Sequence, residues 1–130
     1  MTTTESRNRF REMRASLRLP VVCAPMFLVS GPDLVVAACR SGVIGSFPAP
    51  NARTIDVFEE WLDRIAGEIE LIRSKQEPGA TTVWAQNLVV HRTYARLDAE
   101  LALLQKYRPP IVITALGSPA AVVEAVHDYG

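Results

Sequence analysis

The stretch PVVCAPMFLVSGPDLVVAACRSGVIGSF, from Pro20 to Phe47, decides the fold. It holds two short apolar, β-branched runs, PVVCA and VIGSF, which read as buried strands. Between them, Ser30 and Asp33 have the spacing of a capping box, with Pro32 in the first turn of the helix that this spacing predicts. Gly42 stands where such a helix would stop. The stretch therefore predicts strand, helix and strand, the unit from which parallel sheets are built.

The rest of the chain repeats this alternation. An apolar stripe with steps of three and four predicts a long helix from about Thr54 to Lys75, and a second stripe from Tyr94 to Leu104 predicts another. Ser118-Pro119 begins a last helix that is expected to end near Gly130. The runs VWAQNLVV and IVITAL supply two more strands that are apolar throughout, as strands covered on both faces are. We predict an α/β fold with four parallel β/α units, (β/α)4.

The composition limits the possible functions. The 130 residues include 14 Lys and Arg and 14 Asp and Glu, so net charge gives no argument for nucleic acid or for an acidic membrane surface as partner. No apolar run approaches the ~20 residues that span a bilayer. The basic N-terminus lacks the apolar region of an export signal, which predicts a cytoplasmic protein with Cys23 and Cys39 reduced. The two cysteines have no metal spacing, so no metal site is expected.

Residues 1–19 are predicted to be a separate N-terminal segment. They carry five arginines, while Phe10, Met13 and Leu17 recur at helical spacing. Two interpretations follow: a basic interaction arm, or a short amphipathic helix that covers the end of the domain with its arginines in water. The second is favoured because charge runs are usually solvated faces.

Several polar and flexible residues fall where the predicted strands end. In parallel α/β sheets the carboxyl ends of the strands lie at one rim, and ligands bind there. Pro25 ends the first run and removes a backbone donor, while Met26 offers a polarizable thioether. Asn87 carries a donor and an acceptor on one side chain. The candidate ligand-binding residues at this rim are Ala24, Pro25, Met26, Gly45, Ser46 and Asn87.

Together these residues resemble a known family. The segments PVVCAPMFLVSGPDLVVAACRSGVIGSF, WAQNLVV and IVITALGSP are similar to the N-terminal part of the nitronate monooxygenases, once called 2-nitropropane dioxygenases. These are flavoproteins with a TIM (β/α)8 barrel that oxidise alkyl nitronates with O2. The resemblance implies FMN as cofactor, with the backbone of Ala24, Pro25 and Met26 along the flavin ring. It implies that Asn87 hydrogen-bonds FMN and that Gly45 and Ser46 line the same cavity.

The family's later motifs do not occur in this sequence. A (β/α)8 barrel needs about 250 residues, and neither the glycine-rich phosphate loops nor the Gly-Gly-His loop with the catalytic histidine is found in these 130 residues. Residues 20–130 are therefore expected to be the N-terminal half of such a barrel, weakly active or inactive alone. His91 is the candidate proton acceptor, with a solvated loop histidine as the alternative.

Two other functions stay open at this point. The chain could be a non-catalytic half-barrel fragment or interaction module, which the missing motifs favour. It could also be a flavin-dependent enoyl-acyl-carrier-protein reductase of the same barrel class, although no nicotinamide site is recognisable. A half-barrel would expose the edges of its first and fourth strands, so a homodimer through these edges is a further expectation.

Overall fold

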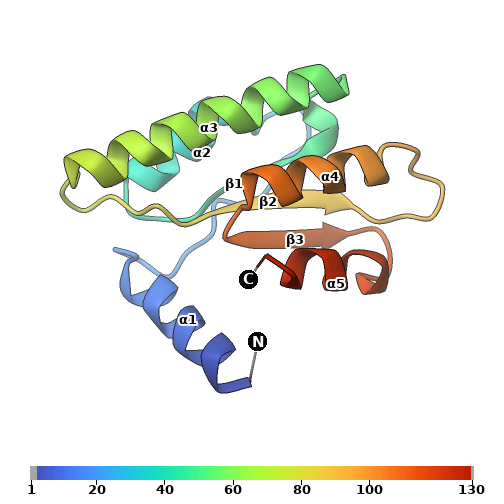
Figure 1. Cartoon of the computed structure of the whole chain (residues 1–130). Coiled ribbons are helices and arrows are strands. Elements are labelled where there is room, and N and C mark those ends of the chain that lie inside the picture. Colours follow the sequence, from blue (N-terminus) through green and yellow to red (C-terminus); the bar gives the residue numbers. More distant parts are fainter. Residues whose placement is uncertain (1–2, 130) are drawn as a thin grey trace.

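The protein is built around a small parallel sheet with helices on its faces (Figure 1). The structure is a computed structural model, and it describes residues 3–129. The sheet has three strands in the order β1-β2-β3, and each strand runs parallel to its neighbour. An α/β fold with a parallel sheet is therefore confirmed. The strands are β1 (Gly45–Pro48), β2 (Trp84–Val89) and β3 (Ile111–Ala115).

Helices follow each strand along the chain. In Figure 1, α2, α3 and α4 lie along one side of the sheet, and α1 lies on the other. The helices are α1 (Thr3–Ala15), α2 (Pro32–Arg40), α3 (Ile55–Lys75), α4 (Leu97–Tyr107) and α5 (Ala120–His127), with a 3-10 turn η1 (Ala49–Asn51). Chain order and sheet order agree, so each crossover connects neighbouring strands.

The main core lies between the sheet and the helices on the α3 side. The predicted stripe of α3 is confirmed, because Phe58, Leu62, Ile65, Ile69 and Ile72 are all buried. Phe47 of β1 is fully buried, and its ring centroid lies 6.0 Å from that of Phe58. Thr54 caps the helix by accepting a hydrogen bond from the Val57 N–H.

The predicted first strand is wrong. Residues 20–24 form a single parallel bridge, in which the Cys23 N–H donates to Ile44 at 2.7 Å and Ile44 N–H donates to Val21 at 3.1 Å. Pro20 and Pro25 flank the run and lack the N–H groups that would extend the ladder. The run is also not buried, since Val21 is 50% exposed. Within the described residues, three β/α units have a strand and a complete (β/α)4 half-barrel is not formed.

Two helix starts also differ from the expectation. The N-cap of α2 is Gly31, which makes no side-chain cap, so Ser30 and Asp33 do not form a capping box. The Ser30 hydroxyl instead accepts from the Met26 N–H at 2.9 Å. Tyr94 lies before α4 rather than within it. In both places the residue that was predicted to belong to the helix, Ser30 or Tyr94, lies in the loop before it.

The N-terminal segment is helical from Thr3 to Ala15. Met13 and Leu17 pack against Ile44, Val83 and Ala85 on the side of the sheet that faces away from α3. The helix therefore covers part of that face, as the second interpretation of residues 1–19 expects. Residues 1–2 of the predicted N-terminal segment and residue 130, near which the last helix was expected to end, lie outside the described residues.

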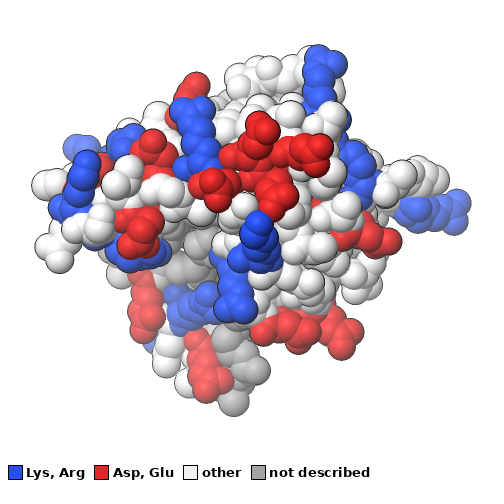
Figure 2. Space-filling view, turned by 45° about the horizontal axis from the view of Figure 1, so that its top comes forward, with Lys and Arg blue, Asp and Glu red and all other residues white. Residues whose placement is uncertain are grey.

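The surface carries both signs of charge. Figure 2 shows acidic side chains gathered on the helix-covered face, where four residues of α3 and Tyr107 line a shallow depression. The four are Asp56, Glu59, Glu60 and Asp63. Glu59 is paired with Lys106 of α4. In the part of the chain described, no helix is long and apolar enough to cross a bilayer.

Candidate functional site

The carboxyl ends of the three strands lie at one edge of the sheet, which we call the rim. The register pairs Val89 with Ala115, so β2 and β3 end level, and it pairs Pro48 with Asn87, so β1 ends two residues before them. The connections after Pro48, Val89 and Ala115 leave from this edge, at the right of Figure 1. The rim is where a parallel α/β sheet binds ligands.

Ser46 and Asn87 lie on the same face of the sheet. Side chains alternate along a strand, and Phe47, Trp84 and Leu88 belong to the core on the helix side. Ser46 and Asn87 therefore face the other way, on the side that α1 partly covers. We call this the inner face. The structure thus brings together two of the predicted rim residues from neighbouring strands.

Both side chains already have protein partners. Asn87 is 6% exposed, and its Nδ2 donates to the Ile113 carbonyl at 2.9 Å. Ser46 is fully buried, and its hydroxyl donates to the Cys23 carbonyl at 2.6 Å. One Asn87 N–H and the Ser46 hydroxyl therefore join strands or the 20–24 segment. The hydrogen-bonding capacity left to a ligand is the second Asn87 N–H, the Asn87 amide oxygen and the Ser46 hydroxyl oxygen.

Residues 24–30 form a tightly held loop at the rim. Asn51 of η1 donates to the carbonyls of Met26 and Ser30, at 3.0 and 2.8 Å, and accepts from the Leu28 N–H at 2.9 Å. Leu28 has a positive φ of 62°, a region that a leucine adopts rarely. The backbone shape of the loop is thus fixed from outside, by a residue that follows β1.

This loop presents apolar side chains to solvent. Met26 is 40% exposed, Phe27 65%, Leu28 72% and Val29 69%. Ala24 is exposed and Pro25 half-buried. The Met26 N–H and carbonyl are both hydrogen-bonded within the protein. Its backbone polar groups are therefore occupied, and its thioether is the part that could contact a ring.

Gly45 lies on the helix side of the sheet. A Cβ added there would lie 2.6 Å from the Val35 carbonyl oxygen of α2. The glycine thus allows close packing of α2 on β1. Gly45 therefore faces the helices, whereas Ser46, which was predicted to line the same cavity, faces the other way.

His91 stands at the rim, just after β2. It is exposed, and its Nδ1 accepts from the Thr93 N–H at 3.3 Å and lies 2.7 Å from the Thr93 hydroxyl. With Nδ1 as acceptor, the neutral ring carries its proton on Nε2. His91 is therefore held near the strand ends while remaining in solvent.

A buried polar group at the rim escaped the sequence analysis. Glu100 of α4 is fully buried, and its Oε1 accepts from the Tyr94 hydroxyl at 2.7 Å and lies 3.1 Å from Arg96 Nη2. Arg96 Nη1 also donates to the Ala52 carbonyl at 2.8 Å. The i,i+4 spacing of Arg96 and Glu100 was the available signal, but such pairs usually lie in solvent.

A sizeable cavity lies away from the rim. It has a volume of about 590 Å³ between α1, α5 and residues 109–112, near the amino end of β3. Arg9, Glu124 and Tyr129 are among its lining residues. A smaller groove of about 360 Å³, which also borders α1, is lined mainly by apolar residues. Neither coincides with Ser46 or Asn87.

Comparisons with known proteins leave the family open. No family model matches the chain, and no curated protein matches it. Among residues 3–129, no group of three or more His, Cys, Asp or Glu side chains could hold a metal ion. The functional argument therefore rests on the residues at the rim.

Proposed function

We propose that this chain contributes the flavin-ring side of an FMN site in an oxidoreductase of the nitronate monooxygenase type. The observation that carries the proposal is that Ser46 and Asn87 share the inner face at the rim, beside the 24–30 loop. The sequence resemblance independently assigns these positions to FMN. A nitronate and O2 are the proposed substrates.

The residues at the rim fit one part of FMN. The Asn87 amide oxygen would accept from a ring N–H, and the Met26 thioether would lie against an aromatic face. A group to hold the phosphate is not identified among the described residues, and no glycine-rich loop occurs in the sequence. The proposal is therefore limited to the ring, with weak or no turnover by these 130 residues alone.

The chain's own residues have limited roles in the chemistry. FMN, when bound, supplies the redox chemistry. Asn87 and Ser46 would orient the ring, and the apolar loop would exclude water from it. His91, the exposed imidazole just after β2, is the residue proposed to take up a proton at the rim.

Visible absorption spectroscopy tests the proposal. The purified chain is mixed with FMN, the excess is removed by gel filtration, and the retained flavin is measured. We expect retained flavin that is reduced severalfold by Asn87→Ala. The exposed Asn8 of α1, changed to Ala, is the matched control and should leave the retention unchanged. A colourless protein, or equal retention by both variants, would contradict the assignment.

A non-catalytic interaction module is the second candidate. β3 is an edge strand in the described sheet and is half-buried at all five positions, whereas β1 is buried at all four. Such an edge pairs readily with another strand. A homodimer through β3 is the form we propose, and a monomeric mass that does not change with concentration in sedimentation experiments would rule it out.

A further inference from the structure

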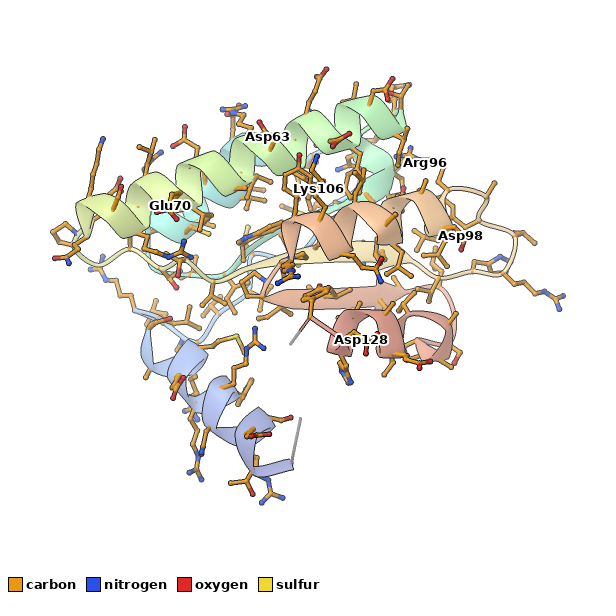
Figure 3. All side chains as sticks on the ribbon, in the orientation of Figure 1. Asp63, Glu70, Arg96, Asp98, Lys106 and Asp128 are labelled. Atoms are coloured by element: carbon orange, nitrogen blue, oxygen red, sulfur yellow. The ribbon has the colours of Figure 1, made fainter. Side chains whose placement is uncertain are left out.

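The connection between β2 and α4 is fastened at its end by a buried ionic group. Arg96 reaches two partners, the Ala52 carbonyl after η1 and the Glu100 carboxylate on α4. Tyr94 donates to the same carboxylate. Figure 3 labels Arg96 at the start of α4, beside the connection that follows β1. Glu100, Arg96 and Tyr94 therefore link the connection after β1, the connection after β2 and helix α4.

Glu100 and Arg96 are buried to different extents. The Glu100 side chain is 0% exposed, whereas the Arg96 side chain is 27% exposed. Arg96 Nη2 lies close to Glu100 without an aligned hydrogen bond, and Glu100 Oε2 has no hydrogen-bond partner among the described residues. The Glu100 carboxylate and the Arg96 Nε and Nη2 atoms are buried, but the Arg96 side chain as a whole is partly exposed. Of the two partners, Arg96 is the one that can move outward.

The titration of Glu100 is set by two opposing influences. Burial, the larger, raises the pKa of this carboxyl above its ordinary value, while the Tyr94 hydrogen bond and the Arg96 charge lower it. Tyr94 and Arg96 are the titratable groups that act on Glu100, and the Glu59–Lys106 pair between α3 and α4 is exposed.

We propose that Glu100, Arg96 and Tyr94 form a pH-operated clasp. With Glu100 ionised, the ion pair holds Arg96 inward, and Arg96 in turn holds residues 90–96 against Ala52. When Glu100 takes up a proton, the carboxyl still accepts from Tyr94 but no longer attracts Arg96, which moves toward solvent. The segment that carries His91 is then released from the body of the protein.

The clasp does not depend on the flavin proposal. Its consequence is that the position of His91 at the rim responds to a fall in pH through a group that is itself out of contact with solvent. Removing the charge of Glu100 while leaving His91 in place isolates the contribution of this carboxyl.

NMR on the intact chain provides the test. The chemical shift of the Glu100 carboxyl carbon is followed through a pH titration. Amide exchange at Tyr94, whose N–H donates to the His91 carbonyl at 2.8 Å, is measured across the same range and corrected for intrinsic rates. We expect a Glu100 midpoint above 4.5, its ordinary value, and exchange that quickens roughly tenfold or more below that midpoint. A midpoint at or below the ordinary value would overturn the proposal.

Variants separate the clasp from a structural role. Glu100→Gln should exchange at neutral pH as fast as the wild type does in acid, and should lose the pH dependence. The exposed Glu60 of α3, changed to Gln, should behave as the wild type. Arg96→Gln should raise the Glu100 midpoint further, which remains informative if the first variant folds poorly. Persistent pH dependence in Glu100→Gln would refute the clasp.

Discussion

Asn51 holds the backbone of Met26 from 25 positions further along the chain, with Nδ2 donating to the Met26 carbonyl at 3.0 Å. The same side chain also reaches the Leu28 N–H and the Ser30 carbonyl. One amide thus makes three hydrogen bonds to a loop whose four apolar side chains point to solvent. The loop's shape depends on Asn51 rather than on burial of its own residues.

Replacing Asn51 with Ala should therefore loosen the loop. Three hydrogen bonds are lost, and we expect the free energy of unfolding to fall by ~1–3 kcal/mol. Urea denaturation measures this fall, and chymotrypsin cleavage after Phe27 or Leu28 should quicken. Asn8→Ala on the exposed side of α1 serves as the control. Unchanged cleavage at both sites would show that Asn51 does not organise the loop.

Two glycines should respond oppositely to alanine. At Gly45 the new Cβ would meet the Val35 carbonyl at 2.6 Å, whereas at Gly67, inside α3, it would meet nothing within 4 Å. Gly45→Ala should therefore destabilise by about 1–3 kcal/mol. Gly67→Ala should stabilise by ~0.5–1 kcal/mol, because alanine is the better helix former. Denaturation midpoints of the two variants should move to opposite sides of the wild type.

Cys39 should make stability fall at alkaline pH. Burial raises the pKa of this thiol from 9.0 to about 11, so the folded state favours the neutral form. Its contribution, up to ~2 kcal/mol, is complete below pH 9 and is lost as the pH rises toward 11. Urea denaturation across this window should show a steeper loss for the wild type than for Cys39→Ala. Parallel slopes would contradict the expectation.

Elements with long, regular patterns were predictable from the sequence. The stripe of α3 has five buried members, and its end carries Arg73 and Lys75 as the helix dipole prefers. The run at residues 20–24 was predicted to be a buried strand because it is rich in β-branched residues. In the described part of the chain it is flanked by prolines and makes only one bridge, so it stays exposed. The residue types alone do not distinguish a buried strand from an exposed extended run.

Only part of the candidate site could likewise be predicted from the sequence. The carboxyl ends of the predicted strands were enough to place Ser46 and Asn87 at the rim. Strand alternation points Gly45 away from its neighbour Ser46, but which of the two faces α2 covers depends on packing that the sequence does not contain. Glu100 was missed because an acidic residue on an amphipathic helix normally faces water, and its burial depends on Arg96 from the preceding connection.

The graded burial of the sheet has a consequence for how the molecule opens. Strands β1 and β2 are enclosed, while β3 is half-buried throughout and is attached on one side to β2. Because strand order follows chain order, β3 and α5 can detach without breaking the β1–β2 ladder. We therefore expect this carboxyl-terminal part to open more readily than β1 and β2, and its amides to exchange before those of β1 in native-state experiments.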